Sequence, residues 1–102
     1  MTKPEPPPTP GQILAEKFLK PLGITEEQLA QELNCPTIRI SALVSGRSGL
    51  LTDTAVRLAR YFGTTDRYWM DLQSDYDLYW TRARLEIDLA AIVPLGAGTG
   101  AS

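Results

Sequence analysis

The chain has 102 residues, a formal net charge of −2, no histidine and a single cysteine, Cys35. This length predicts one domain, large enough to bury a modest core without a metal or a disulfide. The missing histidine excludes a Ser-His catalytic pair and an imidazole metal site, and one cysteine excludes an internal disulfide and a cysteine-rich zinc site.

The expected location is the cytoplasm. No apolar run approaches the roughly 18 residues of a membrane span. The N-terminal MTKPEPPP lacks the apolar segment of a secretory signal. A lone cysteine also fits a reducing compartment. We therefore expect a soluble protein that does not bind membranes.

Residues 1–8 contain four prolines and predict a flexible, extended arm, with a partner contact as the alternative. The first helix is expected to start at Thr9, because Thr9 and Gln12 have the spacing of a capping box. Pro21 disfavours helix at Lys20, so the helix is expected to end there.

A second helix is predicted after Thr25, which forms another capping box with Gln28. Its buried face consists of Leu29, Ala30 and Leu33. A tight turn at Asn34 and Cys35 should follow. Cys35 fits this turn as a small buried residue, and the alternative is a reactive thiol.

The third helix is predicted from Pro36 or Thr37 to about Ser45, with Gly46 in the left-handed position that ends many helices. Its core face consists of Ile40, Leu43 and Val44. Two short helices joined by a tight turn are the sequence form of a helix-turn-helix, whose second helix usually enters the major groove of DNA.

The outward face of the third helix carries neither lysine nor glutamate, which suits a helix that fits inside a groove. Ile38 and Ala42 can meet thymine methyl groups, while Thr37 and Ser41 can bond base edges or phosphates. Arg39 lies at the edge of this face, and it either reaches a guanine or phosphate or remains a solvated flanking residue.

The loop Gly46–Leu51 places Arg47 and Ser48 between two glycines. Backbone amides and a basic side chain just past a recognition helix are suited to a phosphate, and a plain turn is the alternative. Leu50 and Leu51 are expected to return to the core.

A fourth helix is predicted from Asp53 to Phe62, with Thr52 as its cap, Gly63 as its stop and Arg57 solvated. A fifth helix should follow Thr65 and continue to about Ala90. The tail 92–102 is expected to be flexible, and its residues 92–95 are apolar enough for a short strand. The helix-turn-helix domain is therefore predicted to span residues 9–91.

Seven of the eight aromatic residues lie between Tyr61 and Trp80. This is more than the core of a small five-helix domain needs, so some should cover a second copy or another protein. The alternative is that all of them are core. The predicted interface residues are Tyr68, Trp69, Tyr76, Tyr79 and Trp80.

Charge is distributed unevenly. Residues 33–52 contain two arginines and no acid, whereas residues 66–88 contain six acids and three arginines. Positive charge thus lies near the predicted recognition helix. The acids of residues 66–88 alternate with the aromatic stripe, which is typical of a solvated face, and no phosphate-loop motif occurs. The sequence therefore predicts no enzyme, cofactor, metal site or small-molecule substrate.

Three segments together resemble the HigA-type antitoxins, a branch of the XRE (Cro/C1-like) helix-turn-helix proteins. They are TPGQILAEKFLKPLGITEEQLAQEL, ISALVSGRSGLLTDTAVRLARYFGTT and DRYWMDLQSDYDLYW. The resemblance covers about residues 9–85 and implies an all-α, five-helix, lambda-repressor-like fold with a long aromatic C-terminal helix.

The resemblance also implies a function. It implies a homodimer that binds a palindromic operator in double-stranded DNA and represses its own operon. It further implies a partner, a RelE-like mRNA-cleaving toxin that the antitoxin neutralises. Base-facing positions are then Thr37, Ile38, Ser41 and Ala42, and phosphate-facing ones are Pro36 and Arg47.

The sequence leaves two alternatives open. The chain could be a protein-binding module that sequesters a toxin with little DNA binding, which its neutral third helix favours. It could instead be a stand-alone phage-type repressor without a toxin.

Overall fold

The computed structural model of the chain describes residues 5–96, and this part is all-helical. Its elements, in order, are α1 (Pro10–Ile13), η1 (Leu14–Leu19), α2 (Lys20–Leu22), α3 (Glu26–Leu33), α4 (Thr37–Val44), α5 (Thr52–Phe62), α6 (Asp66–Arg84) and α7 (Glu86–Ala90). The predicted fold class, a lambda-repressor-like helix-turn-helix domain, is confirmed. None of the helices in residues 5–96 is both long and apolar enough to cross a membrane.

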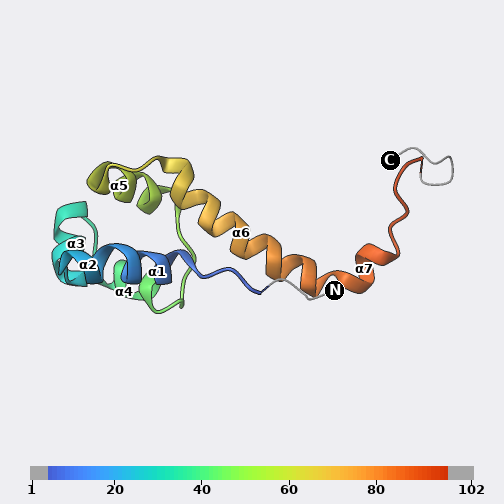
Figure 1. Cartoon of the computed structure of the whole chain (residues 1–102), viewed down its shortest axis with the longest axis horizontal. Helices are drawn as coiled ribbons and strands as arrows, with labels where there is room; N and C mark the ends of the chain where they lie inside the picture. The colour runs from blue at the N-terminus through green and yellow to red at the C-terminus, as the bar shows by residue number, and fades with distance from the viewer. Residues whose placement is uncertain (1–4, 97–102) are drawn as a thin grey trace.

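The molecule consists of a globular body and an extension. Figure 1 shows the helices up to α5 gathered at one end, with α6 running away from them toward α7. The radius of gyration is 17.8 Å and the extents are 57 × 23 × 22 Å, whereas a compact domain of this length has a radius of about 13 Å. We call residues 78–96 the C-terminal arm.

The first helix begins as predicted. Gln12 N–H donates to Thr9 Oγ1 at 3.1 Å, and Thr9 N–H donates to Gln12 Oε1 at 2.9 Å, which completes the capping box. The predicted flexible arm 1–8 lies partly outside the described residues, and residues 5–9 precede the helix without regular structure.

The prediction that Pro21 ends this helix is wrong. The segments α1, η1 and α2 are continuous, and the chain leaves the helix only at Gly23, with φ of 66°. A proline inside an α-helix collides with the carbonyl four residues earlier. Here residues 14–19 form a π turn, in which Lys20 N–H bonds to Ala15 O, and this wider turn accommodates the ring.

The helix-turn-helix pair has its predicted bounds. α3 starts with a capping box in which Gln28 N–H donates to Thr25 Oγ1 at 3.0 Å. Asn34 closes α3 in the left-handed region, with φ of 56°, and the turn leads through Pro36 into α4. Gly46 has φ of 78°, as predicted for the residue after this helix.

α4 approaches the first helix closely at Gly11. A Cβ atom added to Gly11 would lie 1.8 Å from the carbonyl oxygen of Leu43 in α4. Only a glycine permits this backbone contact. The first helix therefore supports α4 from its buried side.

Two predictions at the start of α5 are wrong. Thr52 is the first helical residue and Leu51 is the N-cap, because Ala55 N–H already bonds to Leu51 O at 2.9 Å. Leu51, predicted as core, is 58% exposed because this position turns its side chain outward, whereas Leu50 is buried. Gly63 ends α5 as predicted, with φ of 72°.

The single long helix predicted to Ala90 is interrupted. Leu85, with φ of −98° and ψ of 11°, separates α6 from α7. This part of the chain has left the body, so tertiary packing no longer supports the helix. Residues 92–95 form no strand, since residues 5–96 offer no strand for them to pair with. Residues 97–102 of the predicted flexible tail lie outside the described part.

Trp69 lies at the centre of the core. The prediction that it belongs to an interface is therefore wrong. Its side chain is fully buried, and its ring lies 4.9 Å from that of Phe18 and 6.3 Å from that of Phe62. Its Nε1–H donates to Thr64 Oγ1 at 2.7 Å. The first turn of α6 packs against α5, so its aromatic face at Trp69 points inward.

Candidate DNA interface

α4 presents one side to solvent and the other to the core, as the sequence predicts. Ile40 and Leu43 are buried, while Thr37 and Ser45 are exposed and Ile38 is 72% exposed. The side chains on this outward side, at Thr37, Ile38, Ser41, Ala42 and Ser45, are uncharged and mostly small, which suits a helix that fits inside a groove. The outward face of α4 is therefore the leading candidate for contact with another molecule.

Two residues of this face, Ser41 and Ala42, are less accessible to another molecule than the sequence suggests. Ser41 is half-buried, and its hydroxyl donates to Glu26 Oε1 at 2.7 Å, in the first turn of α3. Ala42 is also half-buried. The Ser41 hydroxyl still has lone pairs to accept a hydrogen bond, but its proton is already used.

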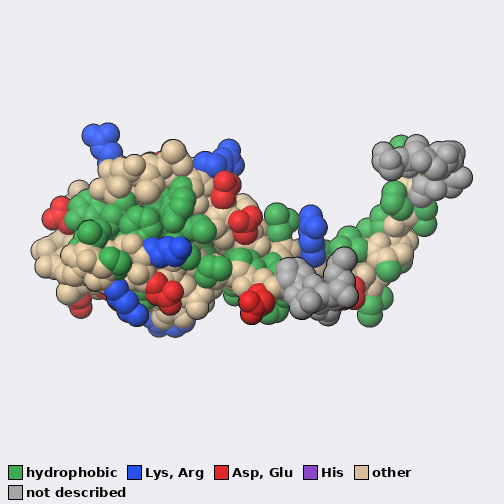
Figure 2. All heavy atoms as spheres, viewed as in Figure 1, with side chains coloured by type: hydrophobic (Ala, Val, Ile, Leu, Met, Phe, Trp, Pro, Cys, Tyr) green, Lys and Arg blue, Asp and Glu red, His purple; other side chains and the backbone are tan. Residues whose placement is uncertain are grey.

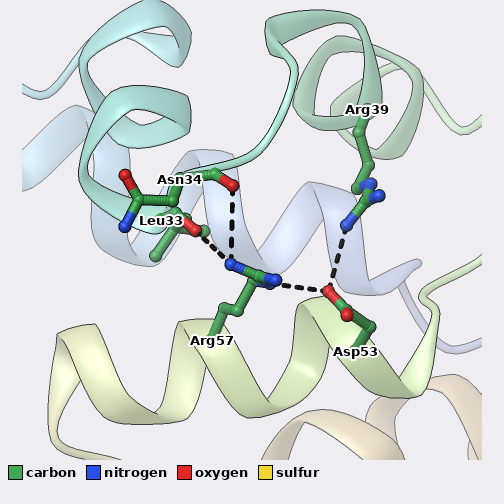
Figure 3. A network of polar contacts seen from close by, with 5 residues as sticks. All are labelled: Leu33, Asn34, Arg39, Asp53 and Arg57. Carbon is green, nitrogen blue, oxygen red and sulfur yellow. Dashed lines mark hydrogen bonds and ion pairs between the residues drawn. The ribbon is translucent and has the colours of Figure 1, made fainter.

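Arg39 lies on the flank of α4 that faces α5. Its Nη1 forms an ion pair of 3.0 Å with Asp53 Oδ1. The same oxygen accepts a hydrogen bond of 2.7 Å from Arg57 Nε. Figure 3 shows Asp53 between the two guanidinium groups.

Arg57 extends this network to the turn between α3 and α4. Its Nη1 donates to the carbonyl oxygen of Leu33 at 2.7 Å and, more weakly, to that of Asn34 at 3.5 Å (Figure 3). These carbonyls belong to the last turn of α3, where helical partners are missing. α5 thereby holds both the end of α3 and the first turn of α4.

The charges in this network stabilise one another. The hydrogen bond from Arg57 and the nearby charges of Arg57 and Arg39 lower the pKa of Asp53 below its ordinary value. The hydrogen bond to Asp53 in turn raises the pKa of Arg57. Both side chains are exposed, so the energetic effect on folding is small.

Sequence reasoning missed the role of Asp53 and Arg57. It treated Arg57 as a solvated residue. The spacing of four residues between them indicates an ion pair within one helix. Nothing in the sequence indicates that the pair also contacts Leu33 and Arg39.

The loop after α4 is held mainly by its own backbone. The amides of Arg47 and Ser48 both donate to the carbonyl of Ala42, at 2.9 and 3.2 Å. These amides are therefore occupied, contrary to the expectation that they bind a phosphate. Arg47 Nε donates a hydrogen bond of 3.0 Å to Ser45 Oγ. Because the Arg47 side chain is exposed, its guanidinium remains available to a phosphate.

A glutamine of α6 fixes the other end of this loop. Leu50 N–H donates to Gln73 Oε1 at 2.6 Å, and Gln73 Nε2 donates to Asp77 Oδ1 at 2.9 Å. Sequence reasoning did not identify Gln73. The loop is thus attached to α4 through the amides of Arg47 and Ser48 and to α6 through the amide of Leu50.

The C-terminal arm carries a row of exposed aromatic and aliphatic side chains. Trp80 is 47% exposed and packs edge-on against Tyr76 and Tyr79, with centroids 6.4 and 5.1 Å apart. Figure 2 shows hydrophobic side chains at several places along the visible part of the extension. Further exposed apolar residues of the arm, which the sequence did not assign to an interface, are Leu78, Ile87, Leu89, Ile92, Val93 and Leu95.

Tyr68 differs from the residues of the arm, since it lies on the body and is 37% exposed. Its ring packs edge-on against Trp69 at 5.1 Å.

Residues 5–96 contain no group of three or more histidine, cysteine, aspartate or glutamate residues placed to hold a metal ion.

The fold and the exposed face of α4 define a lambda-repressor-like helix-turn-helix domain. A family model described as helix-turn-helix matches residues 16–69. Antitoxin HigA-1 of Vibrio cholerae serotype O1 is 35% identical over 86 residues, which cover 83% of this chain and 80% of the relative. Within the helix-turn-helix proteins, the chain belongs to the HigA-type antitoxins.

Solved structures agree with this placement. The Pseudomonas aeruginosa antitoxin HigA, solved with the higBA promoter, is 36% identical, with a TM-score of 0.83 over 87% of this chain and 98% of that one. The antitoxin GraA in complex with its operator is 29% identical, with a TM-score of 0.81 over 92% and 95%.

For some relatives, the chain matches less than two thirds of their length. Virulence-associated protein I of Dichelobacter nodosus is 44% identical over 69 residues, which cover 68% of this chain but only 64% of the relative.

Proposed function

We propose that the chain is the antitoxin of a type II toxin–antitoxin system that binds DNA as a homodimer and represses its own operon. The observation that carries the proposal is the exposed, uncharged face of α4, braced by Asp53 and Arg57 against α5. Solved relatives bound to a promoter and to an operator support the same assignment.

The proposed DNA contacts follow from this geometry. Thr37 and Ile38 read base edges, because they are the most outward residues of the first turn of α4. Ser41 and Ala42 lie deeper on the same face. The flanking positions that we assign to phosphates are Pro36, Arg39, Arg47 and Ser48.

Pairing of two copies is assigned to the apolar C-terminal arm. A row of exposed apolar side chains on an extended helix is costly in water and is rare on a monomer of this size. Trp80 and its neighbours on α6 and α7 give such a row. Two reading helices in a dimer would then contact half-sites about one helical turn, roughly 10 bp, apart.

A RelE-like mRNA-cleaving toxin is the proposed protein partner. The remaining exposed aromatic surface, which includes Tyr68 on the body, is available for it. The expected outcome of the proposal is rescue of cells that express the toxin encoded beside this gene, together with co-purification of the two proteins.

DNA binding is tested by gel shift and footprinting on the DNA upstream of the gene. The expected result is protection of two half-sites and an affinity that falls steeply with salt. Arg47→Ala should weaken binding to all sequences alike, whereas Ile38→Ala should change sequence preference. Absence of binding to this DNA would refute the repressor assignment.

A second candidate is a toxin-binding module with little DNA affinity. Two observations favour it, since Ser41 donates to Glu26 and Arg39 is paired with Asp53. It predicts that a Thr37, Arg39 and Arg47 triple alanine variant rescues cells as well as wild type and leaves promoter activity unchanged. A stand-alone repressor would instead bind the promoter without any toxin encoded nearby.

A further inference from the structure

Asp53 reaches from α5 toward α4, the proposed DNA-reading helix, and its Oδ1 contacts two arginines. Oδ1 lies 3.0 Å from Arg39 Nη1 and 2.7 Å from Arg57 Nε. Arg39 comes from α4 and Arg57 from α5, the helix that also carries Asp53. The carboxylate therefore links α4 to α5 through an ion pair.

The two arginines are held unequally. Arg57 keeps further bonds to the carbonyls of Leu33 and Asn34, at 2.7 and 3.5 Å, and shares a helix with Asp53. Within residues 5–96, Asp53 is the only hydrogen-bonding or ion-pair partner of the Arg39 guanidinium. Loss of the carboxylate would therefore free Arg39 but leave Arg57 attached.

We propose that Asp53 competes with DNA phosphates for Arg39 and so limits the affinity of the chain for DNA of any sequence. This inference rests on the proposed DNA binding. Arg39 follows Ile38, which is 72% exposed, and its own side chain is 35% exposed, so its guanidinium lies at the border of the reading face. A carboxylate and a phosphate offer arginine the same kind of bidentate partner.

The ion pair between Arg39 and Asp53 should be easy to break. Both members of the ion pair are partly exposed, at 35% and 54%, and such surface pairs are weak. Arg39, Asp53 and Arg57 together carry a net charge of +1, and removal of the Asp53 charge raises this to +2 beside α4. Each additional phosphate contact releases about 0.9 counterion, so a free Arg39 should also steepen the salt dependence.

The experiment compares wild type with Asp53→Asn, which keeps the shape and removes the charge. Binding is measured by fluorescence anisotropy across a salt series on two duplexes of equal length. One duplex is the DNA upstream of the gene and the other is unrelated. We expect Kd for both to fall by roughly 1.5- to fivefold. The salt slope should steepen by up to about 0.9.

A double-mutant cycle assigns this gain to Arg39. In an Arg39→Gln background, Asp53→Asn should leave Kd and salt slope unchanged. Asp66→Asn is the charge control, because it removes one negative charge at the start of α6. Thermal melting checks folding, and Asp53→Ser replaces the asparagine variant if that variant is unfolded at the assay temperature.

The outcomes separate the two proposals. An equal gain in the Arg39→Gln background, or in Asp66→Asn, would show a general charge effect and overturn this inference. A folded Asp53→Asn protein that binds more weakly would also overturn it, because Asp53 would then present Arg39 to DNA. If wild type binds neither duplex, the proposed DNA binding fails first and this inference fails with it.

Discussion

The backbone N–H of Leu50 donates a hydrogen bond of 2.6 Å to the side chain of Gln73, 23 residues further along the chain. Leu50 is 6% exposed, so water has little access to replace this bond. Gln73 also donates to Asp77, which orients its amide. Through this bond, the loop that carries Arg47 is attached to α6.

Gln73→Ala should therefore lower the free energy of unfolding by about 1–3 kcal/mol, because a largely buried N–H loses its acceptor. Chemical denaturation followed by circular dichroism measures this change. Gln31→Ala is the matched control, since Gln31 is exposed on α3, and its effect should stay within about 0.5 kcal/mol. Equal effects of the two substitutions would contradict the role of Gln73.

Gly11→Ala should destabilise the body, because the new methyl group would meet the Leu43 carbonyl at 1.8 Å. Overpacking of this kind costs about 1–3 kcal/mol or more. Gly49→Ala serves as the control, since its added methyl group would lie 3.4 Å from the nearest atom of the Gln73 side chain, an ordinary van der Waals distance. Melting temperatures of the two variants give the comparison, and a Gly11→Ala protein as stable as wild type would refute the close approach.

Trp69 and Trp80 should respond differently to truncation. Trp69→Ala removes a fully buried ring and should cost about 3–5 kcal/mol. Trp80 is 47% exposed, so Trp80→Ala should retain the helical spectrum and the stability of the body. Analytical ultracentrifugation should instead show weaker self-association for Trp80→Ala, and unchanged self-association would remove the arm from the dimer contact.

The contribution of Asp53 to stability should depend on pH. In the folded chain, the hydrogen bond from Arg57 is the main cause that lowers the pKa of Asp53 below its ordinary value of 3.8. A lowered pKa gives stability that is complete above the unfolded value and is lost as the pH falls through the folded value. The difference in unfolding free energy between wild type and Asp53→Asn should thus stay constant from about pH 7 to 5 and shrink below about pH 4. A difference that stays constant down to about pH 2 would contradict the assigned pairing.

Local features were readable from the sequence, and distant contacts were not. The caps at Thr9 and Thr25 were predictable because both partners of each capping box lie three residues apart. The left-handed Gly46 and Gly63 were predictable for a similar reason, since glycine tolerates positive φ.

The errors arose where tertiary packing decides the outcome. Helical spacing places Trp69 and Trp80 on one stripe but does not show where α6 leaves the body, so one is core and the other exposed. The ion pair between Arg39 and Asp53 spans 14 residues and depends on how α4 and α5 cross. The π turn before Pro21 has no sequence signature of its own.

The continuity of α6 has a geometric consequence. Its 19 residues span about 28 Å, with Trp69 fixed in the body near one end and Trp80 on the arm near the other. A molecule bound to the arm is thus held at a set distance and angle from the reading helix. Adding one residue to the middle of α6 would rotate the arm by about 100° and advance it by about 1.5 Å. The length of α6 is therefore expected to tolerate change less well than its exposed side chains.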